Sequence, residues 1–202
     1  PAYFSSRPGN YGDKETMKVI ILMTDGSNFT QERISDNYRN QLSPIYRSNG
    51  DGLLSIRHST GRPTCAGTNQ YWVPHLYRSD VTPQPCGGGW KPTPYNSGSG
   101  TTQLTWNQVW QVARTDWVAW QMYAMALCSS STCRTATYNT WEGPNTSPGN
   151  FRTYVDVTTM DSRLDQVCEA AKTNGVLVYG IAFEAPESGQ AAIENCASSP
   201  SS

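Results

Sequence analysis

Charged side chains are scarce in this chain of 202 residues: Asp, Glu, Lys and Arg together make up 15% of it, against roughly 25% in an average globular domain. The charges nearly cancel, with 15 basic and 16 acidic residues, whereas nucleic-acid-binding domains normally carry a basic excess. Apolar runs are short, and none approaches the roughly 18 residues of a membrane-spanning helix. We therefore expect no nucleic-acid partner and no membrane span within this chain.

Residues typical of catalytic and zinc sites are also rare. There are two histidines, His58 and His75, and no Cys-x-x-Cys pair, so the spacing typical of a zinc site is missing. No Gly-x-Ser-x-Gly motif marks a nucleophilic serine, and we expect His75, in a Val-Pro-His-Leu loop, to be packed or at the surface. A glycosidase needs two carboxylates at a set separation. The candidate acids are scattered and no motif links them: Asp80, Asp116, Glu142 and Asp156. These absences favour a protein that is not an enzyme.

Six cysteines are present. An even number without metal-binding spacing favours three disulfides, formed in an oxidising compartment outside the cytoplasm. The alternative is six buried thiols in a cytosolic protein. Many pairings are possible, and sequence order favours Cys65–Cys86, Cys128–Cys133 and Cys168–Cys196.

Two short apolar segments predict buried parallel strands. Residues 18–24 (KVIILMT) precede an Asp25-Gly26 turn, and residues 176–183 (VLVYGIAF) form the second run. Continuous apolar runs of this length are typical of strands that are buried on both faces. Because two strands do not make a stable sheet alone, we expect the parent protein to possess strands that this chain lacks.

Helices are expected around the second strand. One begins at Asp161 or Ser162 and ends near Asn174, where Gly175 supplies the terminating glycine. Another short helix begins near Ser188. The order of strands and helices predicts an α/β fold.

The clearest helix pattern begins at Thr105, which forms a capping-box sequence with Gln108. Apolar residues then follow at spacings of three and four, which predicts one continuous helix of about six turns with a buried face. They are Trp106, Trp110, Ala113, Trp117, Trp120, Ala124 and Leu127. A carbohydrate-stacking surface is the alternative for the tryptophans.

Residues 27–103 lack sustained periodicity, and we expect an irregular insertion here, with weak edge strands at 53–56 or 71–73. Residues 128–158 are also expected to be loop-like. Tyrosines in and before the insertion either form a protein-binding face or pack a loop without a regular core: Tyr3, Tyr11, Tyr38, Tyr46, Tyr71, Tyr77 and Tyr95.

The Thr24-Asp25-Gly26 strand end and the segments 168–183 and 195–199 together resemble von Willebrand factor A domains. More narrowly, they resemble those of the TadG-like proteins of bacterial tight-adherence (Flp) pilus systems. Residues 71–76 and 104–106 resemble an insertion found in some members.

The resemblance covers roughly residues 15–200. It implies a partial Rossmann-like von Willebrand A domain, with a parallel sheet, flanking helices and a long disulfide-containing insertion at 27–103. On this interpretation residues 1–202 are a fragment of one domain, with the first strands expected before Pro1 and the closing segment after Ser202.

The family's metal-ion-dependent adhesion site binds Mg²⁺ or Ca²⁺ through an Asp-x-Ser-x-Ser motif, a Thr from a later loop and the Asp of the Thr-Asp-Gly strand. Only Asp25 matches this set, with Ser27 beside it, and no Asp-x-Ser-x-Ser occurs in the sequence. We therefore expect the metal site to be incomplete within this chain.

The resemblance implies a non-catalytic adhesion or assembly module in the periplasm or at the cell surface. Its partners would be proteins of pilus assembly, and its parent would be membrane-anchored outside this chain. The alternative is a secreted domain that binds or hydrolyses glycans through its aromatic side chains. Sequons at Asn28 and Asn145 carry no meaning in a bacterial protein, and the strands' open edges predict poor behaviour as an isolated monomer.

Overall fold

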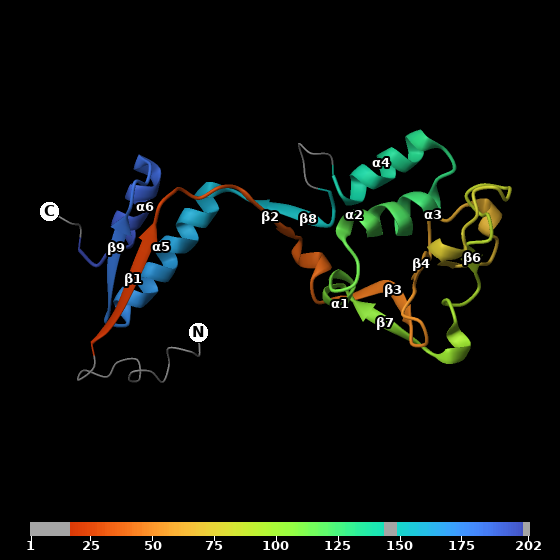
Figure 1. The fold of residues 1–202 in the computed structure, drawn as a ribbon, viewed down its shortest axis with the longest axis horizontal. Helices are drawn as coiled ribbons and strands as arrows, with labels where there is room; N and C mark the ends of the chain where they lie inside the picture. Colours follow the sequence, from red (N-terminus) through yellow and green to blue (C-terminus); the bar gives the residue numbers. More distant parts are fainter. Residues whose placement is uncertain (1–16, 144–148, 200–202) are drawn as a thin grey trace. The chain divides into compact units, whose positions relative to one another are not determined.

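The computed structural model describes residues 17–143 and 149–199, which form a mixed α/β structure with two compact units. Unit 1 comprises the described residues of 1–31 and 154–202, and unit 2 comprises those of 32–153 (Figure 1). Unit 2 is therefore inserted into the sequence of unit 1. Among the described residues, no helix is both long and apolar enough to cross a membrane.

Unit 1 contains the two predicted strands. Strand β1 (Lys18–Thr24) and strand β9 (Val176–Ala182) pair in parallel, with Lys18 opposite Val176 and Thr24 opposite Ala182. The prediction of two parallel strands is confirmed. The parallel sheet has two strands, so the finer expectation of a Rossmann-like sheet stays a prediction.

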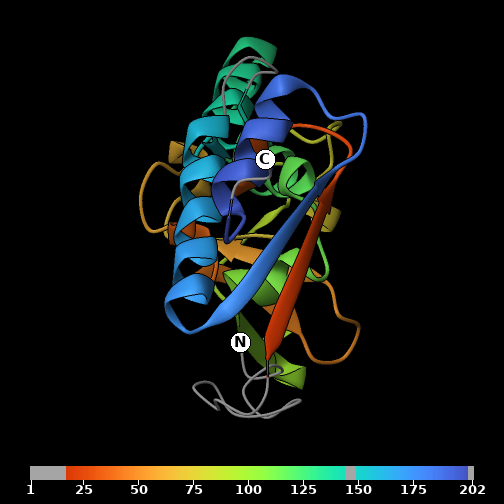
Figure 2. The same ribbon diagram turned by 90° about the vertical axis from the view of Figure 1, so that its left-hand side faces the viewer.

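Helices α5 (Val157–Thr173) and α6 (Glu187–Cys196) lie on the same side of the β1–β9 pair (Figure 2). The start predicted for α5 at Asp161 or Ser162 is wrong, because the side chain of Asp156 accepts a hydrogen bond from the Thr159 amide and caps the helix one turn earlier. Gly175 has a φ of +75°, as expected for the glycine that ends this helix.

The expectation that both strands are buried on both faces is wrong for this chain. Val176 and Val178 are buried, whereas Leu177, Tyr179 and Ile181 are exposed. The cause is the single helical layer. Alternate side chains of a strand point to opposite faces, and among the described residues α5 and α6 cover only one face.

Unit 2 is built around a five-stranded sheet whose paired strands are antiparallel, in the order β6-β5-β4-β3-β7. Its strands are β3 (Leu42–Ser48), β4 (Leu54–Arg57), β5 (Tyr71–Trp72), β6 (Trp90–Lys91) and β7 (Thr101–Thr105). Residues 27–103, expected to be irregular, thus contain regular strands. Strands β4 and β5 lie at the two positions where weak edge strands were expected, but the sheet order makes both of them interior strands, so the expectation of edge strands is wrong. The strands are short and polar residues interrupt them, which hides their periodicity.

Further short elements complete this region. A separate pair joins β2 (Gln31–Ile34) to β8 (Arg152–Val155). Single 3₁₀ turns occupy η2 (Asp36–Tyr38), η3 (Thr64–Ala66), η4 (Pro74–Leu76) and η5 (Ser97–Ser99).

The continuous helix predicted after Thr105 is wrong, although its capping box at Thr105 and Gln108 is present. The chain forms α1 (Trp106–Trp110), α2 (Thr115–Trp117), the π-helix η6 (Val118–Ala124) and α3 (Met125–Leu127). The break occurs at Arg114, whose backbone is extended (φ −81°, ψ 154°).

The tryptophans consequently do not share one buried face. Trp106 is buried, whereas Trp117 and Trp120 are 39% and 38% exposed. A π-helix closes its hydrogen bonds over five residues rather than four, so the spacing of three and four no longer aligns side chains in one row.

Helix α4 (Ser131–Trp141) lies in a segment expected to be a loop, so that expectation is wrong. Ser130 caps it by accepting a hydrogen bond from the Cys133 amide. The helix has no aliphatic stripe, because it is rich in Thr and contacts the core mainly through Tyr138 and Trp141.

Three disulfides join the six cysteines in the pairs that sequence order favours: Cys65–Cys86, Cys128–Cys133 and Cys168–Cys196. The first two lie in unit 2 and the third in unit 1. Three disulfides are compatible with an extracytoplasmic protein.

Candidate functional site

The uncovered face of the β1–β9 sheet is an exposed apolar surface of unit 1. In a parallel pair, residues opposite each other point to the same face, so the register places Val19, Ile21 and Met23 beside three residues of β9. Those partners are Leu177, Tyr179 and Ile181, and all six side chains are exposed. Ile21, Met23 and Tyr179 are 62%, 68% and 57% exposed. Contiguous apolar surface of this kind marks an interaction site.

The opposite face of the sheet holds the core of unit 1. Cys168, Val178 and Cys196 form a buried cluster, against which Leu22, Leu164 and Ala171 pack. Gly180 is required here, because a Cβ at this position would lie 2.2 Å from Cγ2 of Ile193 in α6. The helices are thus fitted closely to one face while the other stays open.

The two edges of the sheet differ. On β9, the carbonyl of Val178 accepts a hydrogen bond from the Ser198 amide, and the Val178 amide donates to Oγ of Ser198. Residues after α6 therefore close the middle of the β9 edge. On β1, no hydrogen bond to the outward backbone groups of Val19, Ile21 or Met23 is found among the described residues.

A groove of about 620 Å³ runs beside the closed β9 edge. It lies between β9 and α6, and its lining includes Gly180, Ala182, Gln190, Ile193 and Ser199. Polar side chains also line it, among them Glu194 and Ser198. No group of three or more His, Cys, Asp or Glu side chains that could hold a metal ion is found in the part of the chain that the structure describes.

The predicted metal ligands Asp25 and Ser27 lie just beyond the carboxyl end of β1. Their turn is held on two sides: Nδ2 of Asn28 donates to Oδ1 of Asp161 over 2.5 Å, and a Cβ on Gly189 of α6 would lie 2.1 Å from the Gly26 carbonyl oxygen. Among the described residues, no group of three or more His, Cys, Asp or Glu side chains that could hold a metal ion is found. Mg²⁺ or Ca²⁺ needs about six or more oxygen ligands, so these residues alone do not complete a site.

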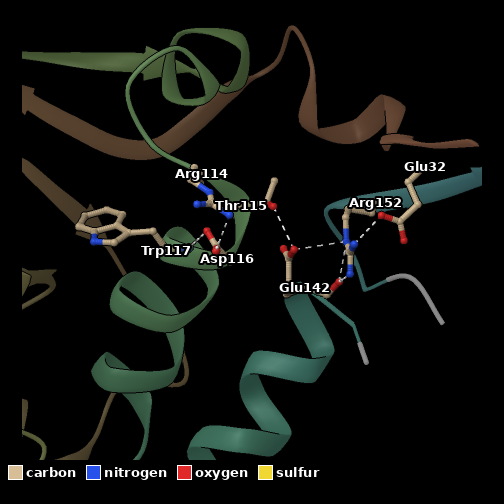
Figure 3. A network of polar contacts seen from close by, with 7 residues as sticks. All are labelled: Glu32, Arg114, Thr115, Asp116, Trp117, Glu142 and Arg152. Atoms are coloured by element: carbon tan, nitrogen blue, oxygen red, sulfur yellow. Dashed lines mark hydrogen bonds and ion pairs between the residues drawn. The ribbon is translucent and has the colours of Figure 1, made fainter. Parts of the chain in front are cut away.

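A second polar feature, the Glu142 network, lies in unit 2 (Figure 3). Glu142, at the end of α4, accepts a hydrogen bond from the Thr115 hydroxyl (3.1 Å) and pairs with Nε of Arg152 (3.4 Å). Arg152 also donates to the Glu142 carbonyl and to Glu32, whose Oε2 lies 2.6 Å from Nη1. The network joins α2, α4, β8 and β2.

Burial sets the electrostatics of this network. Glu142 is 9% exposed, and its desolvation raises the pKa of the carboxyl, an effect that the Thr115 hydrogen bond and Arg152 oppose. Its Oε2 atom has no hydrogen-bond partner among the described residues. Asp116 pairs instead with Arg114. Thr115 and Arg152 both contact Oε1 of Glu142, so this oxygen is held between α2 and β8.

The structure separates the four candidate acids. Asp116 and Glu142 lie in one neighbourhood, whereas Asp80 pairs with Arg78 at the surface and Asp156 caps α5. Sequence reasoning missed Arg152 and Glu32. They lie 120 positions apart, and no local motif marks either residue.

The two histidines have different environments. His58 is buried, its Nε2 donates to the Met122 carbonyl over 2.8 Å, and burial lowers its pKa to about 4. His75 is exposed and its ring lies 4.3 Å from that of Tyr95 in an edge contact. Neither is placed as a general base.

Most of the tyrosines singled out above pack against other rings. Tyr38 contacts Trp106, Trp141 and Phe151, and Tyr46 contacts Tyr71. Tyr77 packs on Trp72, and Tyr95 on His75. Tyr3, Tyr11 and the Asn145 sequon lie outside the described residues. Tyr38 and Tyr77 pack against the core of unit 2, whereas Tyr46, Tyr71 and Tyr95 are half-buried and lie outside that core cluster.

Comparison of the chain with protein-family models, with curated proteins and with solved structures finds no match.

Proposed function

We propose that this protein is a non-catalytic, extracytoplasmic adhesion or assembly module of a tight-adherence pilus system, built on a TadG-like von Willebrand A domain. The parallel β1–β9 pair, with Asp25 at its carboxyl end and helices on one face, supports the domain type. The three disulfides support a periplasmic or cell-surface location.

One observation carries the binding function: the exposed apolar face of β1 and β9. Unit 1 presents this face beside a closely packed opposite face. An apolar surface of this kind gains stability when protein covers it, since roughly 25 cal/mol is gained for each Å² of apolar area removed from water. The proposed partners are proteins of pilus assembly or of the contacted surface.

Binding of a divalent cation would require further ligands from outside the described residues. Asp25 would supply one hard oxygen to Mg²⁺ or Ca²⁺ and Ser27 a second. A partner's carboxylate would complete the coordination. Binding through the apolar face does not depend on this site.

Tyr179→Lys tests the proposal. The side chain is exposed and lies centrally on the apolar face, so a charge there opposes docking without touching the core. Val112→Lys is the matched control, because Val112 is an exposed apolar residue of unit 2 at 48% exposure. Each variant replaces the wild type in a bacterium that uses the protein, and adherence of the cells to a solid surface is counted.

We expect Tyr179→Lys to reduce adherence at least about tenfold, the effect of roughly 1.4 kcal/mol of lost binding, and Val112→Lys to leave it unchanged. Normal adherence of a correctly folded Tyr179→Lys variant would contradict the proposal.

Glycan binding is the second candidate function, and the exposure of Trp117 and Trp120 favours it. Trp120 packs edge-on to Tyr138 with its ring centre 5.9 Å away, and such exposed rings stack on sugars. Titration calorimetry with oligosaccharides tests it, and binding that is abolished in Trp117→Ala and Trp120→Ala would support this function. In a separate assay of sugar release, activity that is abolished in Glu142→Gln would indicate a hydrolase.

A further inference from the structure

The disulfide Cys128–Cys133 lies in unit 2, between the end of α3 and the first turn of α4 (Figure 1). Cys128 is 2% exposed, whereas Cys133 is an exposed residue. Thiol–disulfide exchange begins when a thiolate attacks one sulfur of a disulfide, so its rate depends on access to that sulfur. Within the described part of the chain, the Cys133 side of the bond is the accessible one.

The surroundings of this bond favour negative charge on its sulfurs once it is opened. Cys133 is the third residue of α4, and helical side chains tilt toward the N-terminus, where unpaired N–H groups and the helix dipole stabilise a thiolate. On the other side, Nε of Arg134 donates to the carbonyl oxygen of Cys128 over 3.2 Å. None of the ion pairs found among the described residues involves Arg134. Its positive charge therefore stabilises a thiolate at this pair.

The hydroxyl of Thr137 contacts the buried sulfur of the pair. Its Oγ1 lies 3.2 Å from Sγ of Cys128. Because a sulfur within a disulfide carries no hydrogen, the hydroxyl is the donor of this hydrogen bond. A hydrogen bond to an anion is stronger than one to a neutral group. The contact therefore strengthens when Cys128 becomes a thiolate, so the buried sulfur is a favoured leaving group.

The other two disulfides lack this combination of features. Cys168 and Cys196 are both buried in the core of unit 1. Cys65 is exposed, but it lies in the three-residue turn η3 rather than at the start of an α-helix. In the described residues, no hydrogen bond to the sulfur of Cys65 or Cys86 is found.

The size of the closed loop also separates the three bonds. Cys128–Cys133 spans 5 positions, whereas the others span 21 and 28. The stability that a disulfide contributes by restricting the unfolded chain increases with loop length. Opening the short loop therefore costs the fold least, and Tyr138 and Trp141 still hold α4 on the core of unit 2.

We propose that Cys128–Cys133 is a thiol–disulfide exchange site. Cys133 is the sulfur that a partner thiolate attacks, and Cys128 is the buried sulfur that leaves and later re-forms the bond. The partner is identified by its chemistry as a thiol compound or a protein with two thiols. The proposal goes beyond adhesion or assembly and does not depend on it.

The exchange takes place in two steps and transfers two electrons. A partner thiolate attacks Sγ of Cys133, the S–S bond breaks, and its electron pair stays on Sγ of Cys128, where the Thr137 hydroxyl stabilises it. A second partner thiolate then attacks the partner's sulfur in this mixed disulfide, and Cys133 leaves as a thiolate. The partner is oxidised to a disulfide, and the chain's disulfide is reduced to two thiols that take up the protons the partner lost. The reverse steps re-form the bond.

Equilibration of the full chain with mixtures of reduced and oxidised glutathione tests the proposal without any substitution. Free thiols are alkylated after an acid quench, and the tryptic peptide 115–134, which contains both cysteines, is followed by mass spectrometry. Cys128–Cys133 is expected to open at a value of [GSH]²/[GSSG] at least about tenfold lower than either other disulfide requires. Prior opening of another disulfide, or opening of all three together, would overturn the proposal.

Cys128→Ser and Cys133→Ser identify the attacked sulfur, because each variant keeps one thiol of the pair. Oxidised glutathione is added to each, and the mixed disulfide is quantified with time. Cys133 in the Cys128→Ser variant is expected to react at least about tenfold faster than Cys128 in the Cys133→Ser variant, owing to its exposure and its place in the first helical turn. Equal rates, or faster reaction of Cys128, would contradict the assignment.

Thr137→Val tests the donor to the leaving sulfur. Valine keeps the size and branching of threonine but has no hydroxyl, so reduced glutathione is expected to open the disulfide at least about threefold more slowly. Thr135→Val is the matched control at an exposed position of the same helix and is expected to keep the wild-type rate. A wild-type rate in Thr137→Val would contradict Cys128 as the leaving sulfur.

Reduced thioredoxin and reduced glutathione, offered separately to the wild-type chain, distinguish the two kinds of partner. A rate constant at least about tenfold higher with thioredoxin identifies a protein dithiol, and comparable rate constants identify a small thiol. A Cys128–Cys133 bond that neither reagent opens while the chain remains folded would overturn the proposal.

Discussion

Unit 2 buries most of its large apolar side chains, whereas unit 1 exposes many of its own. All seven tryptophans of the chain lie between Trp72 and Trp141, and the fully buried residues of unit 2 include Ile45, Ile56 and Phe151. In unit 1, β1 and β9 expose apolar side chains along one whole face. The difference shows that unit 2 has an extensive buried core, whereas the described part of unit 1 has a small core and an exposed apolar face, which the proposed function assigns to partner binding.

The largest expected effect comes from the aromatic core of unit 2. Phe151 is fully buried, and its ring lies within 6 Å of those of Tyr38, Trp106, Trp110 and Trp141. Phe151→Ala is expected to lower the free energy of unfolding by about 3 to 5 kcal/mol through the cavity it leaves. Urea unfolding followed by tryptophan fluorescence measures it, because every tryptophan reports on unit 2.

Phe183→Ala is the counterpart in unit 1. Phe183 is 66% exposed, so its removal is expected to change stability by less than about 0.5 kcal/mol. Hydrogen exchange of the unit 1 amides measures this change. An equal loss of stability in Phe151→Ala and Phe183→Ala would contradict the difference between the two units.

The disulfides give the next largest effect. Cys168–Cys196 closes a loop of 28 residues and lies in the core cluster of unit 1, whereas Cys128–Cys133 in unit 2 spans 5. Loop-closure entropy predicts a loss of about 3 to 4 kcal/mol for Cys168→Ala with Cys196→Ala, and of about 2 kcal/mol for Cys128→Ala with Cys133→Ala.

Hydrogen exchange resolved by peptide compares the two double variants. Faster exchange confined to unit 1 in the first variant and to unit 2 in the second is the expected result. Unit 1 amides that stay protected without Cys168–Cys196 would show that its small core is sufficient.

Acid sensitivity provides a further comparison of the two units. His58 of unit 2 has a pKa of about 4 in the folded protein, below its ordinary 6.5, because of burial. The unfolded chain therefore binds a proton first as the pH falls, so stability present above pH 6.5 is lost progressively toward pH 4, by up to roughly 3 kcal/mol. The raised pKa of Glu142 acts in the opposite direction, favouring the folded state as the pH falls.

His58→Gln isolates the histidine, since the amide keeps a donor for the Met122 carbonyl but does not titrate. Between pH 6.5 and pH 4.5, the unfolding free energy of wild type is expected to fall more than that of His58→Gln. Urea unfolding detected by fluorescence measures both. A difference that does not vary with pH would show that His58 is protonated alike in both states.

Local patterns predicted the parts of the fold that local chemistry controls. The continuous apolar runs gave β1 and β9, the Thr105 capping box starts α1, and Gly175 ends α5. The break at Arg114 and the π-turns of η6 escaped the same reasoning, because tertiary packing sets them. Helix α4 escaped it because aromatic residues anchor a polar sequence.

The functional features divide in the same way. Sequence placed Asp25 and Ser27 at a strand end, but the apolar face became visible only when the pairing of β1 with β9 and the position of the helices were known. Glu142 was named as a scattered acid, and its clamp by Arg152 and Thr115 depends on contacts between distant segments. Residues that meet only through such long-range contacts form no local sequence motif, so the sequence does not reveal them.

The insertion of unit 2 between β1 and β9 has a consequence for synthesis. About 150 residues separate the two strands. At a translation rate of about 5 to 20 residues per second, β9 is synthesised roughly 8 to 30 s after β1. Unit 2 is contiguous in sequence and can fold during this interval. For that time β1 is a nascent apolar segment without its native neighbour, as a substrate of chaperones that hold extended apolar peptides would be.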